Sequence, residues 1–471
     1  MKPGPTLARR LLPLGWVLLT LIALPGVLWI VLRAALAPPP GDWAAEIGRG
    51  PFKLQASVPQ LVWLATTPWI GERLAGRAVP SRLGPLTLGW VSAGGPGDAP
   101  ALTLRCQPCR LPLPPALGQP EGLRVPAAQI TLARGDAQSL HGTLRLEMMP
   151  PRSPAAHGAL PPAGALAALG RPGGGEKMPP RSPAAQNEAA LTAHWQARRA
   201  GPGWRVVIDW PAAPARQWFE LLAPGLPELA AAQIEGTLAL RVELPLPPRE
   251  GTSDWRIAPR IEGLTVSGLG TQDWALAQSA CGRTPPLPAR HWLARAVLAA
   301  EDQRFYEHTG FDPEELAAAL QANQQAGAIR RGASTLSQQL AKLMVTGGER
   351  QLERKARELL YALDAEAALG KGRILQLYLA NAPWGIDAQG RPICGAQAAA
   401  RHYFGVSARR LTPRQAVTLA AMLHNPQMEA ARWRAEGGVS SARLHWVAAQ
   451  VRGVQPAQRR ALLAQLDEPE F

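Results

Sequence analysis

The chain has 471 residues, which is enough for two or three domains that each have a core of their own. Its formal net charge of +15 and its pI near 10.7 indicate an anionic partner, but charge alone leaves nucleic acid, anionic lipid and a phosphorylated substrate open. The four cysteines include a single C-x-x-C pair, and a zinc site would need four ligands together, so the composition argues against bound zinc.

The N-terminus carries an apolar stretch without charge at residues 11–32, long enough to cross a bilayer as a helix. Lys2, Arg9 and Arg10 precede it, so the positive-inside rule places the N-terminus in the cytoplasm. Residues 35–37 (ALA) have the form of a signal-peptide cleavage site, which is the competing interpretation. The stretch is longer than a usual signal core and Pro38 follows the site, so we expect residues 1–40 to form a cytoplasmic stub and an uncleaved anchor. The chain would then be a single-pass protein of the cell inner membrane with its bulk in the periplasm.

Residues 41–285 are predicted to form a β-rich extracytoplasmic domain. Short segments that alternate apolar and polar residues are separated by turn residues, as in antiparallel sheets. Both a sandwich and an elongated sheet fit this pattern. The segments that carry it are 101–106, 129–135, 141–148, 204–210 and 236–244.

An insert interrupts this region at 149–188. The octapeptide MPPRSPAA occurs at 149–156 and again at 178–185, with Gly-, Ala- and Pro-rich sequence between the two copies. Such a composition cannot bury a core, so we expect a flexible loop. No residue cluster between 50 and 280 suggests catalysis.

Four cysteines in an exported chain allow three disulfide pairings. Cys106 and Cys109 lie together in RCQPCR, and Cys281 and Cys394 flank the part of the chain that is richest in motifs. We expect the pairs Cys106–Cys109 and Cys281–Cys394.

The pattern changes near residue 286, where apolar residues take up helical spacing. Residues 286–430 are therefore predicted to be mainly α-helical, and the tail 431–471 has a helical, polar pattern that fits either packing on this domain or fraying. The predicted fold class is thus a multidomain α+β protein.

Glu301 and Asp302 end an apolar helix that includes residues 296–300. A carboxylate beside an apolar surface has a raised pKa and can act as a base, whereas a solvated charge at a helix end is the alternative.

Polar side chains follow at helical spacing in two further segments. Ser334 suits the N-cap of the next helix, and Ser334, Gln338 and Lys342 are four residues apart, so one face would offer groups that contact phosphate or sugar oxygens. Arg350, Arg354 and Glu358 are also four apart, with Lys355 adjacent. This second set fits either a surface ion-pair ladder or a clamp for a diphosphate.

These segments resemble motifs of the peptidoglycan glycosyltransferases, glycosyltransferase family 51, of the monofunctional biosynthetic transglycosylase type. EDQRFYEHTGFD (301–312), GASTLSQQLAK (332–342) and ERQLERKARE (349–358) resemble the first three motifs, and GKGRILQLYL (370–379) and AAARHYFG (398–405) resemble the fourth and fifth. The five stand in the family's order and cover roughly 286–430. A second long domain after residue 430, such as the transpeptidase of two-domain members, is not apparent.

The resemblance implies a lysozyme-like helical domain at the membrane surface that polymerises lipid II into glycan strands, with inversion at the anomeric carbon and release of undecaprenyl diphosphate. Glu301 would be the general base and Glu358 the second acidic residue. The residues implied to hold the diphosphate or the sugar, or to support the site, are Asp302, His308, Ser334, Thr335, Gln338, Gln339, Lys342, Arg350, Arg354 and Lys355. No cofactor is required, although a divalent cation (Mg²⁺ or Mn²⁺) at the diphosphate is compatible with the family.

Two positions depart from the family pattern. Leu343 follows Lys342 where the family has Asn, and Ala380 stands between Leu379 and Asn381 where the fourth motif has Asn directly. Both changes spare the proposed base and cations, so they bear on substrate positioning more than on the type of reaction.

Three other functions remain open. A degenerate copy would bind lipid II or other cell-wall synthesis proteins without turnover, and a lysozyme-like hydrolase would use a related scaffold. The cations argue against the hydrolase, because finished glycan carries no diphosphate. Nucleic-acid binding conflicts with the export signal, and no recognition motif appears. The expected partners are therefore lipid II, the nascent glycan strand and the membrane.

Overall fold

The computed structural model describes residues 27, 29–31, 33–39, 42–47, 53–79, 81, 83–92, 100–111, 122–136, 139–148, 190–201, 203–247, 255–276, 279–326, 332–345 and 351–467. Most of the apolar stretch 11–32, the insert 149–188 and Arg350 lie outside these residues. Within the described part of the chain, no helix has both the length and the apolar character needed to cross a membrane.

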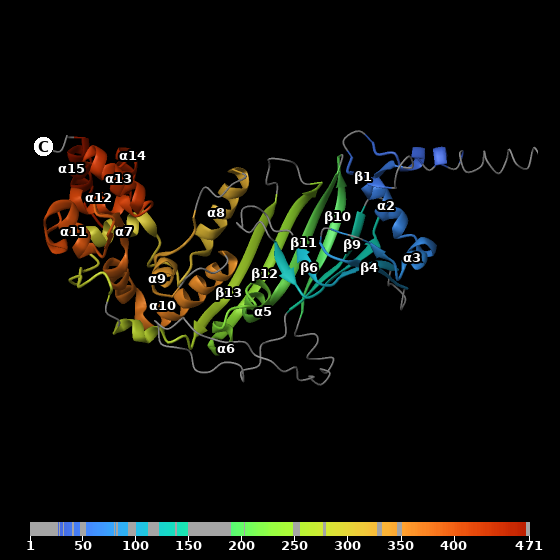
Figure 1. Cartoon of the computed structure of the whole chain (residues 1–471), viewed down its shortest axis with the longest axis horizontal. Coiled ribbons are helices and arrows are strands. Elements are labelled where there is room, and N and C mark those ends of the chain that lie inside the picture. The colour runs from blue at the N-terminus through green and yellow to red at the C-terminus, as the bar shows by residue number, and fades with distance from the viewer. Residues whose placement is uncertain are drawn as a thin grey trace, which may run out of the picture.

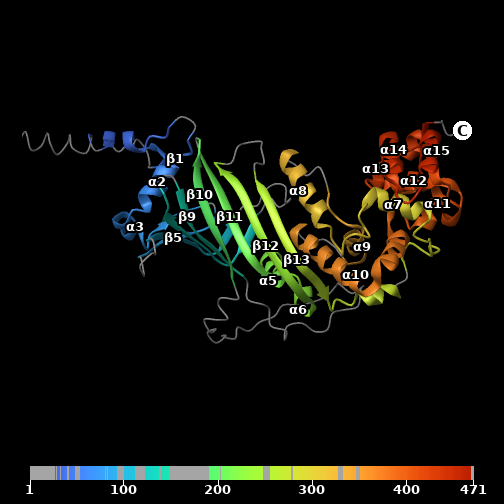
Figure 2. The ribbon, with the colours of Figure 1, turned by 180° about the vertical axis from the view of Figure 1, so that it is seen from behind.

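The molecule is elongated, with a long curved sheet at its centre (Figures 1 and 2). Helices α2 (Val58–Ala65) and α3 (Pro68–Leu74) lie at one end, and the C-terminal helices gather at the other. The predicted division into a β-rich N-terminal part and a helical C-terminal part is confirmed.

The sheet has nine antiparallel strands in the order β13-β12-β11-β10-β9-β8-β5-β4-β3, so sequence neighbours are mostly neighbours in space. All five strand segments predicted from alternation form strands of this sheet. Its strands are β3 (Ala78–Val79), β4 (Leu86–Val91), β5 (Ala101–Cys106), β8 (Ala128–Arg134), β9 (Ser139–Glu147), β10 (Ala190–Ala200), β11 (Gly203–Pro214), β12 (Gln233–Leu246) and β13 (Arg256–Ser267). Three two-stranded sheets pair β1 (Ala44–Ile47) with β2 (Leu54–Ser57), β6 (Cys109–Leu111) with β7 (Leu123–Val125), and β14 (Pro383–Ile386) with β15 (Pro392–Cys394).

One face of the long sheet is apolar and carries helices. On β10 the side chains of Trp195 and Ala197 are buried while those of His194 and Gln196 are exposed, as period-two alternation requires. The apolar side is covered by α2 near Trp195 and by α5 (Ala215–Leu222) near Trp210. The sequence left a sandwich and an elongated sheet open. The described residues form the elongated sheet, since its apolar face is covered by helices and not by a second large sheet.

The remaining helices are α6 (Glu228–Ala231), η4 (Thr271–Ala275), α7 (Trp292–Glu301), α8 (Pro313–Ala326), α9 (Leu336–Val345), α10 (Gln351–Asn381), α11 (Ala396–Phe404), η5 (Ala408–Arg410), α12 (Pro413–Met422), α13 (Pro426–Glu436), α14 (Ser441–Gln450) and α15 (Pro456–Asp467). Helix α10 is interrupted at Gly370, whose φ of 70° and ψ of 163° are not helical. A side chain at this φ would be strained, so glycine permits the bend.

The C-terminal tail packs into the helical domain. Val447, Ala448 and Val451, at the end of α14, and Leu462 of α15 are buried in one hydrophobic core with Leu293 of α7. The burial of these apolar side chains shows that the described part of residues 431–471 packs on the helical domain rather than frays.

Helix α10 also packs against the β-rich region. Leu360 and Leu363 share a hydrophobic core with Phe219 of α5 and Val266 of β13, and Leu352 packs against the core that includes Trp218. Polar groups reinforce this interface, because the buried Asp364 carboxylate accepts hydrogen bonds from Thr271. Helix α10, which carries the predicted cations, is therefore held by the β-rich region, which contains none of the five motifs.

A buried ion pair at this interface makes a testable contribution. Arg357 Nε lies 2.8 Å from Glu228 Oε1, and the two side chains are only 13% and 9% exposed. We expect Glu228→Leu to lower the free energy of unfolding by about 3 kcal/mol, because it leaves a poorly solvated guanidinium without this carboxylate. Urea unfolding measures the change.

Two control variants accompany this measurement. Changing both residues to leucine should cost much less than Glu228→Leu alone. At the exposed Lys53–Glu46 pair, Glu46→Leu should change the free energy by less than about 1 kcal/mol. Equal effects of Glu228→Leu and Glu46→Leu would contradict the account of the interface.

Both predicted disulfides are present, Cys106–Cys109 and Cys281–Cys394. The first closes the turn between β5 and β6. The second joins the segment before α7 to β15 across a sequence separation of 113 residues, so it restrains most of the helical domain.

The two disulfides should differ in their effect on stability. Constraining an unfolded loop of 113 residues stabilises the fold by about 5 kcal/mol in the chain-entropy model, whereas a separation of 3 gives about 1.5 kcal/mol. We therefore expect Cys281→Ala/Cys394→Ala to be far more destabilising than Cys106→Ala/Cys109→Ala in guanidinium unfolding. Equal losses from the two double variants would refute this ranking.

Candidate active site

Glu301 is the last residue of α7, and its carboxylate points into the protein. The preceding residues Ala296, Val297 and Ala299 are buried, so the helix end is anchored in the core. The Glu301 side chain is only 11% exposed.

An amide from α9 holds this carboxylate. Gln339 Nε2 donates to Glu301 Oε2 at 2.9 Å, and Gln339 Oε1 accepts from the hydroxyl of the buried Tyr378 at 3.1 Å. Because the tyrosine hydroxyl occupies the amide oxygen, the amide NH₂ is directed toward Glu301. The other carboxylate oxygen, Oε1, is buried and has no hydrogen-bond partner among the described residues.

Burial raises the pKa of Glu301 above its ordinary value of 4.5. The hydrogen bond from Gln339 and the charges of Arg443 and His424 oppose this rise, and the neighbouring charge of Asp302 adds to it. A raised pKa strengthens a carboxylate as a base, as we expected for a group at the end of an apolar helix.

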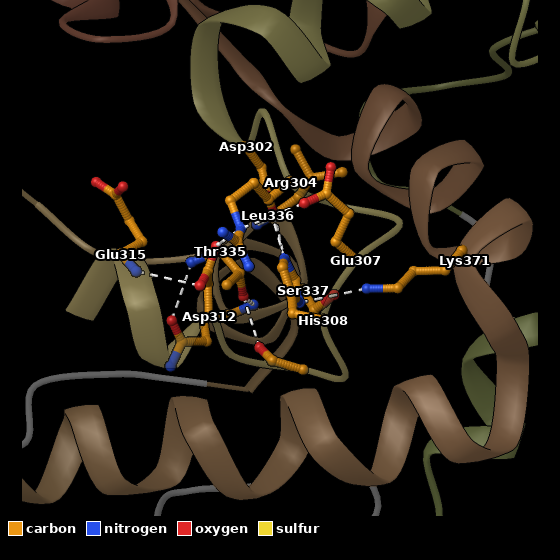
Figure 3. Close-up of polar contacts among 12 residues, drawn as sticks. Asp302, Arg304, Glu307, His308, Asp312, Glu315, Thr335, Leu336, Ser337 and Lys371 are labelled. Carbon is orange, nitrogen blue, oxygen red and sulfur yellow. Dashed lines mark hydrogen bonds and ion pairs between the residues drawn. The ribbon is translucent and has the colours of Figure 1, made fainter. Parts of the chain in front are cut away.

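Asp302, which directly follows Glu301, and its partner His308 are both buried, and Asp302 fastens the end of α7 to α9 (Figure 3). Asp302 accepts hydrogen bonds from Leu336 N at 2.8 Å and from His308 Nε2 at 3.1 Å. On the other side of the ring, His308 Nδ1 lies 3.4 Å from Lys371 Nζ, which also donates to Glu366 at 2.7 Å. These contacts suit support of the site, one of the two roles that the resemblance implies for His308.

The N-cap of α9 lies one residue later in the chain than the sequence predicted. Thr335, not Ser334, caps the helix: its hydroxyl accepts from Gln338 N at 3.2 Å, and Gln338 Oε1 accepts from Thr335 N at 3.0 Å. Ser334 precedes the cap, so the prediction that it shares a helical face with Gln338 and Lys342 was wrong. Its hydroxyl instead accepts from Lys355 Nζ at 2.8 Å. Lys342 is exposed on α9.

Two cations of α10 flank a buried carboxylate. Glu358, which is 1% exposed, accepts from Arg354 Nη1 at 2.7 Å and from Lys355 Nζ at 2.6 Å. The side chains of Arg354 and Lys355 are themselves 24% and 47% exposed, so both can reach an anion from solvent. Glu358 thus holds the cations in place and neutralises part of their charge.

The segment at the start of α9 joins the carboxylate and the cations. Gln339 contacts Glu301 on one side, while Ser334 contacts Lys355 on the other. The first three motifs therefore meet around the first turn of α9, although they come from three separate helices.

The two departures from the family pattern have different surroundings. Leu343 is 39% exposed on α9, beyond Lys342. Asn381 accepts from Ser279 Oγ at 2.8 Å and donates to Leu377 O at 2.8 Å, so its amide fastens the end of α10 next to the Cys281–Cys394 disulfide.

Sequence reasoning missed two groups at the site. Arg443 of α14 lies 3.8 Å from Glu301 Oε1, and Lys371 and Glu366 complete the cluster around His308. The sequence carries no local signal for the contact of Arg443 with Glu301, because it forms only when α14 packs on α7.

The described residues contain no group of three or more His, Cys, Asp or Glu side chains placed to hold a metal ion. Both oxygens of Glu358, the carboxylate beside the cations, are engaged by Arg354 and Lys355. The donor set around the cations therefore does not fit a resident divalent ion.

A buried carboxylate of raised pKa near a pair of cations suits a proton transfer coupled to the departure of an anion. The arrangement therefore fits a transfer reaction in which the leaving group is an anion.

Comparison with known proteins supports the resemblance in the helical domain. Residues 286–452 match the family model described as Transglycosylase. The biosynthetic peptidoglycan transglycosylase of Alcanivorax borkumensis is 50% identical over 137 residues, which are 29% of this chain and 54% of the relative. Proteins of the same name from Bordetella avium and Ectopseudomonas mendocina are 48% identical over 139 and 143 residues, or 56% and 55% of their lengths.

Residues 286–452 are therefore similar to the transglycosylase family, and the resemblance inferred from the five motifs is confirmed. The match extends past residue 430 and includes Arg443. The chain spans about half the length of the curated relatives it matches, and the β-rich region lies outside the family match.

Proposed function

We propose that this chain is a membrane-anchored peptidoglycan glycosyltransferase that polymerises lipid II. The observation that carries the proposal is the buried carboxylate of Glu301, held by Gln339 of α9, the helix that Ser334 precedes with its contact to Lys355. The names of the relatives, biosynthetic peptidoglycan transglycosylases, support the same activity.

In the proposed reaction Glu301 acts as the base. Its carboxylate takes the proton from the 4-hydroxyl of the acceptor sugar as that oxygen attacks the anomeric carbon of the growing chain. The new C1–O4 bond forms on the face opposite the leaving diphosphate, so the configuration inverts. Burial favours the neutral form of the carboxyl group that results from the proton transfer.

The electrons of the broken C1–O bond leave on undecaprenyl diphosphate. Arg354 and Lys355, with Lys342 and Arg350 as further candidates by motif position, would stabilise this anion. Because the diphosphate is already a stable anion, cations can take the place of a proton donor. The described residues around Glu358 offer no ligand set for Mg²⁺ or Mn²⁺, because Arg354 and Lys355 engage both oxygens of this carboxylate.

We further propose that residues 11–32 anchor the chain in the inner membrane, with the remainder in the periplasm. The charge pattern of the N-terminus supports this orientation. The anchor would bring the domain to the surface that carries its lipid-linked substrate and nascent glycan, where other cell-wall synthesis proteins also act.

The test is to incubate the detergent-solubilised full chain with labelled lipid II, with and without moenomycin. We expect long glycan that moenomycin suppresses. Binding of lipid II without polymer would instead show a degenerate copy, and degradation of preformed glycan would show a hydrolase.

A further inference from the structure

Arg443, in the C-terminal part of the helical domain, contacts the end of α7 at two points. Its Nη2 donates to the carbonyl oxygen of Ala300 at 2.9 Å and lies 3.8 Å from Glu301 Oε1. This is the carboxylate oxygen without a hydrogen-bond partner among the described residues. A guanidinium therefore faces the one part of the Glu301 carboxylate that Gln339 does not hold.

The surroundings of Arg443 fix its position. Its guanidinium stacks on the Trp446 ring at 4.4 Å, and only 22% of its side chain is exposed. Helix α14 packs on both α7 and α12, so Arg443 is carried by an element of the domain core. The charge is thus held in one place relative to Glu301, unlike that of an exposed arginine on a mobile stem.

Several charged or titratable groups share this environment. Asp302 adjoins Glu301 on its own helix, and Tyr378 of α10 reaches it through Gln339. His424, just after α12, lies 3.7 Å from the fully buried Glu429 of α13, whose other oxygen accepts from Ser440 N at 2.9 Å. Arg443 lies in the field of both Glu301 and Glu429, so it offsets two carboxylates that are poorly solvated.

We infer that Arg443 is a positioning residue for the proposed reaction, which keeps the Glu301 carboxylate ionised and oriented as a base. The inference rests on the proposed function of Glu301. Without the guanidinium, Glu301 would keep its burial and its hydrogen bond from Gln339 but lose the cation next to Oε1. Its charged form would then be less favourable at a given pH.

The alternative role is structural, since a donor to Ala300 O would simply cap the end of α7. Two substitutions separate the roles. Arg443→Gln replaces the cation by a neutral hydrogen-bond donor, whereas Arg443→Lys keeps the charge with a different shape.

The sign of the effect follows from the reaction. A base works only when it is ionised, so the rate falls as the pH drops through its pKa. Removing a nearby cation raises that pKa, so Arg443→Gln should move the acidic midpoint of the kcat/KM profile upward by about one pH unit. Well below both midpoints, the rate should be roughly tenfold lower than that of the wild type. Arg443→Lys should keep a midpoint close to that of the wild type.

The measurement uses the full chain in detergent with labelled lipid II, and it is repeated in a His424→Gln background because the charge of His424 also acts on Glu301. In parallel, ¹³C NMR of glutamate-labelled protein follows the Glu301 carboxyl group, assigned with Glu301→Gln. This second readout does not need turnover. An upward shift for Arg443→Gln but not for Arg443→Lys supports the inference. The inference would be overturned if neither variant shifted the midpoint in either readout. A wild-type chain that forms no polymer would contradict only the proposed function.

Discussion

Glu301→Gln is expected to lower the rate of glycan polymerisation by about 10² to 10⁴-fold, the contribution typical of a general base. Glutamine fills nearly the same volume and can still pair with Gln339, but it cannot accept the proton of the acceptor hydroxyl. Affinity for lipid II should change little, because the proposed diphosphate contacts come from α10. Polymer formed from labelled lipid II measures the rate, and fluorescence titration measures binding.

The matched control is Glu436→Gln on α13. The Glu436 side chain is 70% exposed, and its nearest described cation, Arg432, is 3.9 Å away. We expect this variant to polymerise at the wild-type rate. Full turnover by Glu301→Gln would remove Glu301 from the role of base, whatever the control shows.

The second large effect is expected when the charges of the α10 cations are removed. Arg354→Gln/Lys355→Gln alone would leave Glu358 buried without these partners, so Glu358→Gln is added to keep the fold free of an uncompensated charge. Each charge-assisted hydrogen bond to the diphosphate is worth about 1.5 to 3 kcal/mol. The triple variant should therefore lose about 10² to 10⁴-fold in kcat/KM for lipid II.

A control is needed because the triple change alters three interacting side chains of one helix. Glu358→Gln alone keeps both cations and should lose much less activity than the triple variant. Arg432→Gln removes a partly exposed charge on α13, away from α10, and should have no effect. If the triple variant folds with a wild-type melting temperature and retains wild-type kcat/KM, the α10 cations do not hold the leaving group.

Local patterns predicted the elements of this fold well. The alternation at 236–244 marks β12, and the apolar spacing before Glu301 marks α7, because each pattern follows from one element that buries one face. The same logic placed a carboxylate of raised pKa at the end of α7.

Two features of the site could not be predicted because they depend on tertiary packing. Whether Thr335 or Ser334 caps α9 depends on Gly310, whose carbonyl oxygen accepts from the Thr335 hydroxyl at 2.6 Å across 25 residues of sequence. Arg443 reaches Glu301 only because α14 returns to pack on α7. Neither contact leaves a local pattern in the sequence.

The interface between the β-rich region and α10 could not be predicted for the same reason. Its strands were predictable, but its attachment to α10 through Phe219, Leu363 and the Glu228–Arg357 pair was not. A hydrophobic face on α10 is compatible with any apolar partner, and only the fold selects the partner. The helix that carries Arg354 and Lys355 is thereby anchored on the sheet.

The most direct test of the central claim is a structure of the full chain with non-reactive lipid II analogues bound as both donor and acceptor. We predict that the diphosphate of the donor contacts Arg354 and Lys355, and that the 4-hydroxyl of the acceptor lies within hydrogen-bond distance of Glu301. A diphosphate bound away from α10, or a Glu301 carboxylate that no sugar reaches, would contradict the account.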